Sequence, residues 1–348
     1  MRAVVYDGYG ATPQVRDVAA PTCPPRGVVV DVLATGVCRS DWHAWRGEDP
    51  VDLPHVPGHE LVGVVAQVGE QVRRWHVGDR VTVPFVCGCG RCEWCLAGEP
   101  QVCPDQTQPG FTGPGSFAAQ VALHEADLNL VALPDAISDV TGAALGCRFA
   151  TAYRALVTHA RLARGQWLAV YGLGGVGLSA LLIGVALGAR VVAVDVSVAA
   201  LERAVALGAA ATVSSAETSD AAAAVRSITG GGAHATIDAI GSPTVAAACV
   251  WSLRRRGRHV QAGLLLGDDA TPPIPMDRVI AEELEIYGTH GLAAADYPAM
   301  LELVASGAVP LDRLVGRVVG LDDAPAALMA MSDPASSGRS ITVVTPRS

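Results

Sequence analysis

A stretch of 25 residues without a charged side chain, Gly165 to Ala189, most constrains what this chain of 348 residues can fold into. As a helix, the stretch would be long enough to cross the roughly 30 Å hydrocarbon layer of a membrane. Seven of its residues are glycine, however, and four of these fall between Gly172 and Gly177, where they would break a spanning helix at its middle. We therefore expect no membrane span, but a strand, a glycine-rich turn and a helix.

The glycine-rich turn follows the apolar run Trp167–Tyr171 and has the G-x-G-x-x-G spacing of a dinucleotide-binding loop. In such a loop Gly172 allows the tight turn, Gly174 lets the backbone approach a pyrophosphate, and Gly177 lets the helix pack closely on its strand. The N–H groups at the start of the helix would bind the phosphates. The residues that we expect to contact the cofactor here are Gly172, Gly174, Gly175, Val176 and Gly177.

Asp195 ends the next apolar run, 18 residues after Gly177. A carboxylate at this place can accept hydrogen bonds from the ribose hydroxyls of the adenosine half of a dinucleotide, and it would repel a 2′-phosphate. No Arg or Lys follows it within residues 196–198. The sequence therefore favours NAD over NADP.

The sequence has two regions with different residue patterns. From about residue 165 to 288, short apolar runs alternate with helical patterns, which predicts a parallel, doubly wound sheet. Before residue 150, Gly and Pro recur every 8 to 12 residues between alternating runs, which indicates an antiparallel, β-rich domain. We expect a helix at about 294–305, another around 324–331 and a last strand at 340–344. The strands expected in the parallel sheet are 167–171, 190–195, 211–213, 235–239, 258–262 and 285–288.

Charge and cysteine content narrow the function. Lys and Arg number 25 and Asp and Glu 34, so the net charge is −9, which argues against nucleic acid as a partner. The nine cysteines are an odd number in a chain whose N-terminus has no signal-peptide core. This pattern fits metal or catalytic roles in the cytoplasm better than a disulfide framework.

Four cysteines have the spacing of a closed metal site. They follow the pattern Cys89-x₂-Cys92-x₂-Cys95-x₇-Cys103 on a loop that contains glycine. Four thiolates suit a tetrahedral zinc whose role is structural, because every position around the metal is taken by protein. Cys87 stands just outside the pattern, and we interpret it as a spare thiol.

A second, dispersed set consists of Cys38, His59 and Cys147. Two thiolates and one imidazole would leave the fourth position of a zinc ion open, as in catalytic sites. Taken singly, each residue could equally be a buried cysteine or a hydrogen-bonded core histidine.

Five motifs in order decide between these interpretations, and through them the chain resembles the zinc-dependent medium-chain alcohol dehydrogenases over nearly its whole length. The motifs are Cys38-x-Ser40-Asp41-x-His43, Pro57-Gly58-His59-Glu60, the four-cysteine pattern, Cys147 and the glycine turn. The resemblance implies an α/β chain in which a GroES-like catalytic domain (1–148 and 288–348) is interrupted by a Rossmann NAD-binding domain (149–287). It also implies two zinc ions per subunit and a homotetramer or homodimer.

The resemblance also implies roles for single residues. Cys38, His59 and Cys147 would hold the catalytic zinc, while Asp41 orients the histidine. Glu60 would either approach the metal or form a salt bridge. Ser40 and His43 resemble a proton relay from the substrate to solvent. Candidate contacts to the cofactor are Arg39 and Arg339 at the pyrophosphate and Thr151 near the nicotinamide, and candidates for the substrate pocket wall are Trp42 and Phe85.

The expected reaction is the interconversion of primary or secondary alcohols and aldehydes or ketones, with hydride transfer to NAD. One alternative is a polyol or amino-alcohol dehydrogenase of the same superfamily, although some of these carry Glu where Cys147 stands. Another is a non-catalytic zinc protein, which would not need Ser40 and His43 beside an open metal position. Zinc-free quinone or enone reductases are disfavoured, because they lack the metal ligands.

Overall fold

The computed structural model describes residues 1–333 and 340–347, and they divide into two compact units. The first unit comprises residues 1–150 and the described part of the segment after 290. The second comprises residues 151–290. Within the described residues, no helix is both long enough and apolar enough to span a membrane.

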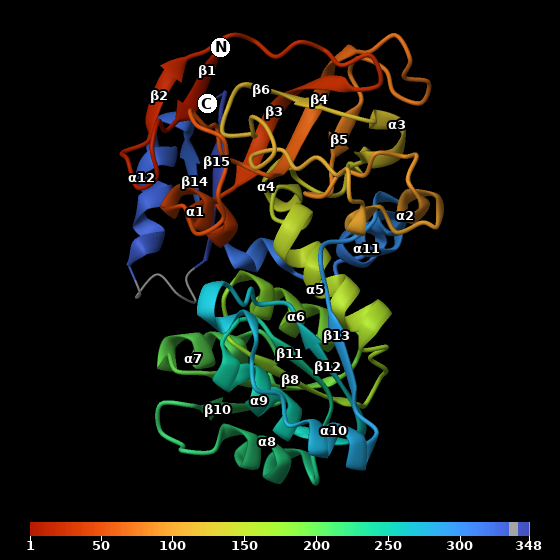
Figure 1. Ribbon diagram of the computed structural model, residues 1–348, viewed down its shortest axis with the longest axis vertical. Helices are drawn as coiled ribbons and strands as arrows, with labels where there is room; N and C mark the ends of the chain where they lie inside the picture. Colours follow the sequence, from red (N-terminus) through yellow and green to blue (C-terminus); the bar gives the residue numbers. More distant parts are fainter. Residues whose placement is uncertain (334–339, 348) are drawn as a thin grey trace. The chain divides into compact units, whose positions relative to one another are not determined.

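The first unit is built on a seven-stranded mixed sheet in the order β14-β15-β3-β4-β5-β7, with β6 also paired to β3 (Figure 1). Its pairs are antiparallel except β14 with β15, which run parallel. A two-stranded sheet, β1 with β2, completes the unit. The strands are β1 (Arg2–Val5), β2 (Gln14–Asp17), β3 (Val28–Gly36), β4 (Glu60–Val68), β5 (Arg80–Thr82), β6 (Gln120–Leu123), β7 (Val131–Ala132), β14 (Val315–Gly320) and β15 (Ile341–Thr345).

Short helices connect these strands, and two of them carry residues of the candidate site. The helix α1 begins directly after Cys38, and a π-helical turn, Leu145–Phe149, carries Cys147. A turn of this kind is rare and is often found at functional sites. The α-helices of this unit are α1 (Arg39–Arg46), α2 (Glu93–Leu96), α3 (Ala126–Asn129), α4 (Asp139–Gly142), α11 (Tyr297–Ala305) and α12 (Ala324–Met329). The helix α5 (Ala150–Arg154) begins at the last residue of the first segment and belongs mostly to the second unit.

The second unit is a six-stranded parallel sheet in the order β10-β9-β8-β11-β12-β13 (Figure 1). This confirms the doubly wound sheet expected from the alternating pattern. Its strands are β8 (Trp167–Tyr171), β9 (Arg190–Asp195), β10 (Ala211–Ser214), β11 (Ala233–Asp238), β12 (Leu253–Gln261) and β13 (Glu285–Gly288). Its helices are α6 (Gly175–Ala186), α7 (Val198–Ala206), α8 (Ala221–Thr229), α9 (Pro243–Trp251) and α10 (Met276–Glu282).

The long uncharged run folds as strand β8, the glycine turn and helix α6, as the sequence pattern predicts. Both elements are largely buried, which explains the absence of charge, because a parallel strand is covered on both faces. The prediction for β12 was wrong at its start by five residues. The strand continues back through Arg254–Arg256, whose exposed side chains gave it the appearance of a loop.

Candidate active site and metal centres

Asp41 is the organising residue of the dispersed cysteine and histidine set. It lies in the first turn of α1, is fully buried, and accepts hydrogen bonds from the backbone N–H of Cys38 (2.9 Å) and of Gly58 (3.0 Å). Its carboxylate also lies 2.8 Å from Nδ1 of His59. One buried carboxylate thus holds the backbone beside the cysteine and the ring of the histidine in a single arrangement.

The side chains of Cys38, His59, Glu60 and Cys147 converge, with one ligand atom of each within 4.8 Å of every other. Because Asp41 engages Nδ1, His59 directs Nε2 at this group, and Nε2 is buried without a hydrogen-bond partner among the described residues. A buried polar atom without a partner is costly, and a metal ion would satisfy it. The residues therefore fit zinc, which prefers sulfur and nitrogen ligands.

The electrostatics of the set favour the thiolate of Cys38 but keep His59 and Cys147 protonated. The Cys147 thiol, with help from Arg148 and His59, holds the pKa of Cys38 well below its ordinary value, although burial acts in the opposite direction. Burial alone would lower the pKa of His59, but the charge and hydrogen bond of Asp41 keep it well above its usual range. A metal would therefore displace a proton on binding, since only the neutral imidazole can coordinate it.

Glu60 forms a buried ion pair with Arg148, a partner that we did not predict. Arg148 donates from its backbone N–H and from Nε, both at 3.1 Å, to Oε1 of Glu60, and its Nη2 donates to Oε2. Burial raises the pKa of Glu60, and Arg148 offsets part of that increase. The ion pair therefore links Glu60 to the residue that directly follows Cys147 in the chain.

We expect Arg148→Met to destabilise the protein by about 3–5 kcal/mol, because the substitution leaves the fully buried Glu60 carboxylate without its cation. Urea unfolding followed by circular dichroism measures the effect. The matched control is Arg2→Met, which removes the exposed partner of Asp322 and should cost no more than about 1 kcal/mol. Equal unfolding midpoints for the two variants would contradict this interpretation.

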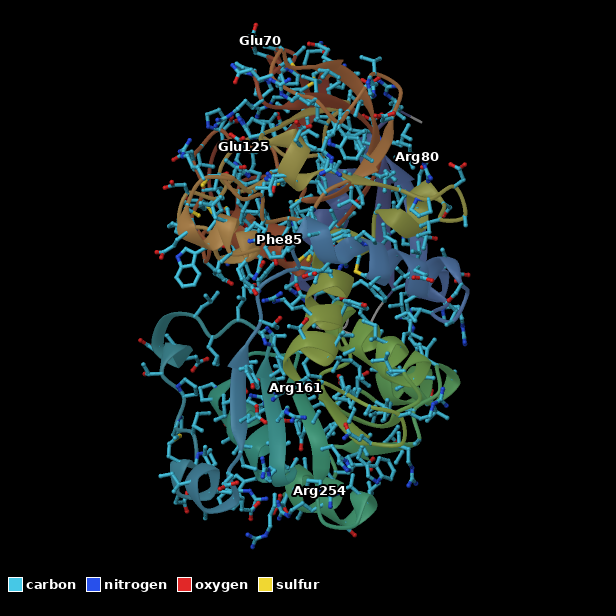
Figure 2. All side chains as sticks on the ribbon, turned by 90° about the vertical axis from the view of Figure 1, so that its right-hand side faces the viewer. Glu70, Arg80, Phe85, Glu125, Arg161 and Arg254 are labelled. Atoms are coloured by element: carbon cyan, nitrogen blue, oxygen red, sulfur yellow. The ribbon has the colours of Figure 1, made fainter. Side chains whose placement is uncertain are left out.

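Aromatic rings cover the metal set. Phe85, labelled in Figure 2, packs against Cys38 and Cys147, and its ring centre lies 6.1 Å from that of His59. Phe111 lies closer, at 5.0 Å, and was missed because no motif marks it. The indole N–H of Trp42 donates to Ser332 and its ring lies under the guanidinium of Arg39, so its place in the substrate pocket wall stays a prediction.

The structure places the remaining predicted residues of the first unit as follows. The hydroxyl of Ser40 lies 3.9 Å from the sulfur of Cys38, and His43 lies one turn further along α1, with Nδ1 2.5 Å from the carboxylate of Glu48. Arg39 donates to the carbonyl of Met331, so its contact with a pyrophosphate stays a prediction. Arg339 lies outside the described residues.

The four patterned cysteines form a second cluster, with their sulfur atoms within 4.8 Å of one another. All four are free thiols, and backbone N–H groups point at their sulfurs, from Cys89 to Cys103 and from Cys95 to Cys92, both at 3.4 Å. N–H donors from Arg91 and Cys92 lower the pKa of Cys89 to about 7, whereas burial raises that of Cys95 to about 12. The cluster thus offers the donor set of a closed zinc site.

Two neighbours of this cluster matter. Cys87 lies outside it, and burial raises the pKa of its thiol to about 12, which fits a thiol without a ligand role. Asn129 brackets the loop by accepting from the backbone N–H of Gly88 (2.9 Å) and donating to its carbonyl (3.0 Å). We did not predict Asn129, because it stands 41 residues away from its partner.

The glycine turn of the second unit has room for a ligand. A side chain at Gly177 would come within 1.7 Å of the carbonyl oxygen of Gly172, so only glycine allows α6 to start this close to β8. A side chain at Gly174, in contrast, would meet nothing within 4 Å, so the backbone is open there. Gly174 caps α6 without a side-chain hydrogen bond, which leaves the first N–H groups of the helix, from Gly175 onward, for an anion.

Asp195 ends β9 beside this turn. Its carboxylate accepts from the backbone N–H of Leu173 (2.7 Å) and of Ser197 (2.8 Å), which ties the glycine turn to the end of the neighbouring strand. Thr151, in α5, is 8 % exposed, and its place near a nicotinamide stays a prediction.

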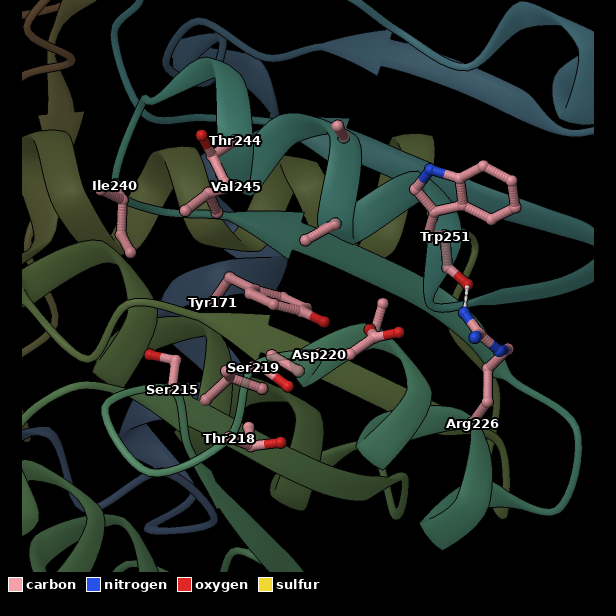
Figure 3. A pocket seen from close by; sticks show the side chains of 15 residues that line it. Tyr171, Ser215, Thr218, Ser219, Asp220, Arg226, Ile240, Thr244, Val245 and Trp251 are labelled. Atoms are coloured by element: carbon pink, nitrogen blue, oxygen red, sulfur yellow. Dashed lines mark hydrogen bonds between the residues drawn. The ribbon is translucent and has the colours of Figure 1, made fainter.

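A pocket of about 590 Å³ opens at the carboxyl ends of β8 and β9, where Tyr171 and Val194 line it (Figure 3). In doubly wound sheets, ligands bind at these strand ends. Apolar groups such as Val194, Ile240 and Val245 line it together with the hydroxyls of Ser215 and Thr218. A flat aromatic base with polar edges fits such a lining.

Comparisons with known proteins agree with this geometry. Residues 24–135 match the family described as alcohol dehydrogenase GroES-like domain, and residues 175–306 match that described as zinc-binding dehydrogenase. An alcohol dehydrogenase of Geobacillus stearothermophilus is 36% identical over 313 residues, which cover 89% of this chain and 90% of that protein.

Solved structures extend the similarity to the whole chain. An NAD-dependent alcohol dehydrogenase is 31% identical with a TM-score of 0.87, and the match covers 99% of this chain and 100% of that one. A protein of Sinorhizobium meliloti 1021 bound to NADP is 27% identical with a TM-score of 0.88, and 99% of both chains are covered. The similar proteins thus include one described as NAD-dependent and one with NADP bound.

Proposed function

This chain belongs to the family of zinc-dependent medium-chain alcohol dehydrogenases, and we propose that it interconverts primary or secondary alcohols and the corresponding aldehydes or ketones with NAD. The observation that carries the proposal is the buried, unpartnered Nε2 of His59 beside the sulfurs of Cys38 and Cys147. Three protein ligands leave one position of a tetrahedral metal for the substrate oxygen.

Residues of the first unit have separate roles in metal binding, proton transfer and the exclusion of water. Cys38, His59 and Cys147 would hold the zinc, which would supply Lewis acidity that favours loss of the alcohol proton. Asp41 keeps the ring of His59 in its ligating orientation. Ser40 and His43 take the proton towards solvent, and Phe85 and Phe111 keep water away from the reacting carbon.

The residues of the second unit bind the hydride carrier. Bound NAD would supply the acceptor for the hydride at its nicotinamide ring. The N–H groups at the start of α6 would bind its pyrophosphate, Asp195 the ribose, and the pocket lined by Val194 the adenine. The four-cysteine cluster would hold a second, structural zinc, which would give each subunit two zinc ions.

We infer a cytoplasmic enzyme that forms a homotetramer or homodimer. Nine free thiols, of which six belong to the proposed metal sets, suit a compartment that keeps cysteines reduced. Light scattering coupled to size-exclusion chromatography measures the oligomeric state.

The test of the function is a panel of primary, secondary and polyhydroxylated alcohols with NAD, followed through the absorbance of the reduced nicotinamide. We expect turnover with simple alcohols and reversal with the matching carbonyl compounds. A zinc-loaded protein that reduces NAD with none of these alcohols would contradict the proposal.

Asp195→Asn tests the assignment of NAD. The amide keeps an oxygen for the N–H of Leu173 but loses the charge that repels a 2′-phosphate and binds the ribose. We expect the ratio of kcat/KM for NAD over NADP to fall about 10- to 100-fold, the equivalent of a hydrogen bond to a charged group. Glu202→Gln, an exposed acid on α7, is the control and should leave the ratio unchanged. An unchanged ratio in Asp195→Asn would refute the assignment.

A further inference from the structure

His43 has a carboxylate partner, Glu48, that no sequence motif predicts. Nδ1 of His43 lies 2.5 Å from Oε2 of Glu48, five residues further along the chain. The imidazole side chain is 24% exposed and that of Glu48 is 44% exposed, so the pair reaches solvent. Nε2 of His43 has no hydrogen-bond partner among the described residues, which leaves one ring nitrogen held and the other available.

The end of α1 builds this contact. Gly47 ends the helix with φ 78°, and the N–H groups of Glu48 (3.0 Å) and Asp49 (3.4 Å) both return to the carbonyl of His43. A side chain at Gly47 would meet the ring of Tyr9 at 2.9 Å. Tyr9 also holds the following loop, because its hydroxyl donates to the carbonyl of Val51. Gly47 is therefore a well-defined C-cap of α1, and the turn brings Glu48 back towards His43.

The other charged side chains of α1 lie against groups other than His43. Of the charged neighbours on or beside α1, Asp41 faces the metal set and Arg39 lies over Trp42. Arg46 lies over the ring of Trp45. Of the elements packed against α1, α12 and the 3-10 helix Ala330–Ser332 contain no ionisable side chain. The loop before β2 contributes Tyr9, whose ring lies against Gly47 and whose hydroxyl donates to the carbonyl of Val51.

We propose that Glu48 is a positioning residue of the proton relay, which holds His43 as the tautomer with the proton on Nδ1 and the lone pair on Nε2. A carboxylate can only accept, so Nδ1 must donate to it, and Nε2 is then the nitrogen that takes a proton. When Nε2 is protonated, the Glu48 carboxylate balances the positive charge of the ring until the proton passes to water. This inference rests on the proposed alcohol oxidation.

The experiment compares Glu48→Ala and Glu48→Gln with Asp49→Ala in the zinc-loaded protein. Asp49 is the exposed acid next along the chain, and the structure gives its side chain no part in the relay. We expect kcat for alcohol oxidation to fall about tenfold in Glu48→Ala, less in Glu48→Gln, which retains an acceptor, and not in Asp49→Ala. The KM of the alcohol should stay within about twofold, because Glu48 acts on proton transfer and not on binding.

The tautomer gives a second measurement that does not depend on turnover. Long-range ¹H–¹⁵N correlation spectra at pH 8.5 should show the Nδ1–H form of His43 in the wild type and in Asp49→Ala, and a mixture in Glu48→Ala. If the wild type is active and Glu48→Ala has the same kcat and the same His43 tautomer, the role of Glu48 is overturned while the proposed function stands. A zinc-loaded wild type without alcohol-dependent NAD reduction would overturn the proposed function and the relay with it.

Discussion

Serine in place of Cys38 is expected to reduce alcohol-dependent NADH formation more than about 100-fold, beyond the loss typical of a residue that only supports a metal ligand. The hydroxyl of serine is a poor ligand for zinc, and Cys38 is one of three protein groups around the open position. The zinc content should fall by one ion per chain, because the four-cysteine cluster lies on a different loop and keeps its metal.

The control for this experiment is Cys23→Ser. Cys23 is a free thiol outside both clusters, and the variant should keep its activity and both metal ions. Circular dichroism establishes that each variant is folded before the activities are compared. Full activity of Cys38→Ser with one zinc ion lost would show that the reaction does not use the metal at this set.

Serine in place of Cys103 is expected to unfold the four-cysteine loop without direct damage to the active site. The buried cluster of this loop consists of cysteines, with Leu128 as its apolar neighbour, and its regular structure is two short helical turns. Bonds to metal must therefore supply most of its stability, as in small domains that fold only with zinc. A loss of even about 3 kcal/mol would lower the melting temperature of a chain of 348 residues by roughly 4 °C.

Limited digestion with trypsin locates the effect. Arg91 lies within the loop with an exposed side chain, and cleavage after it should be slow in the wild type and fast in Cys103→Ser. Cys87→Ser is the control, because Cys87 is buried beside the loop but stands outside the cluster. Equal cleavage rates in Cys103→Ser and the wild type would show that the loop does not depend on metal.

Local spacing accounts for what could be predicted of the site. The four cysteines fall within 15 residues of one another, and the glycine turn is a hexapeptide, so their chemistry can be recognised without knowledge of the fold. Strands β8 and β9 begin and end where predicted, because buried parallel strands are largely apolar. Strand β13 also has the predicted bounds, although its side chains are half-buried or exposed. Strand β12 begins earlier than predicted, because exposed arginines occupy its first half.

Contacts between distant segments explain what could not be predicted. Arg148 meets Glu60 across 88 residues, and Phe111 approaches His59 across 52, and neither residue type is unusual at its place in the sequence. Glu48 is close to His43 along the chain, but it faces the ring only because Gly47 reverses the backbone at the end of α1. Such partners depend on backbone paths that a linear pattern does not contain.

By itself, the sequence determined the donor atoms, their order along the chain and the phosphate-binding turn, because each depends on residue type and short spacing. Only the tertiary structure decided which atoms meet: that Asp41 engages Nδ1 of His59 and so directs Nε2 at the two thiols, and that Arg148 rather than solvent neutralises Glu60. The physical reason is that a buried polar atom must find its partner wherever the fold brings one within hydrogen-bond distance.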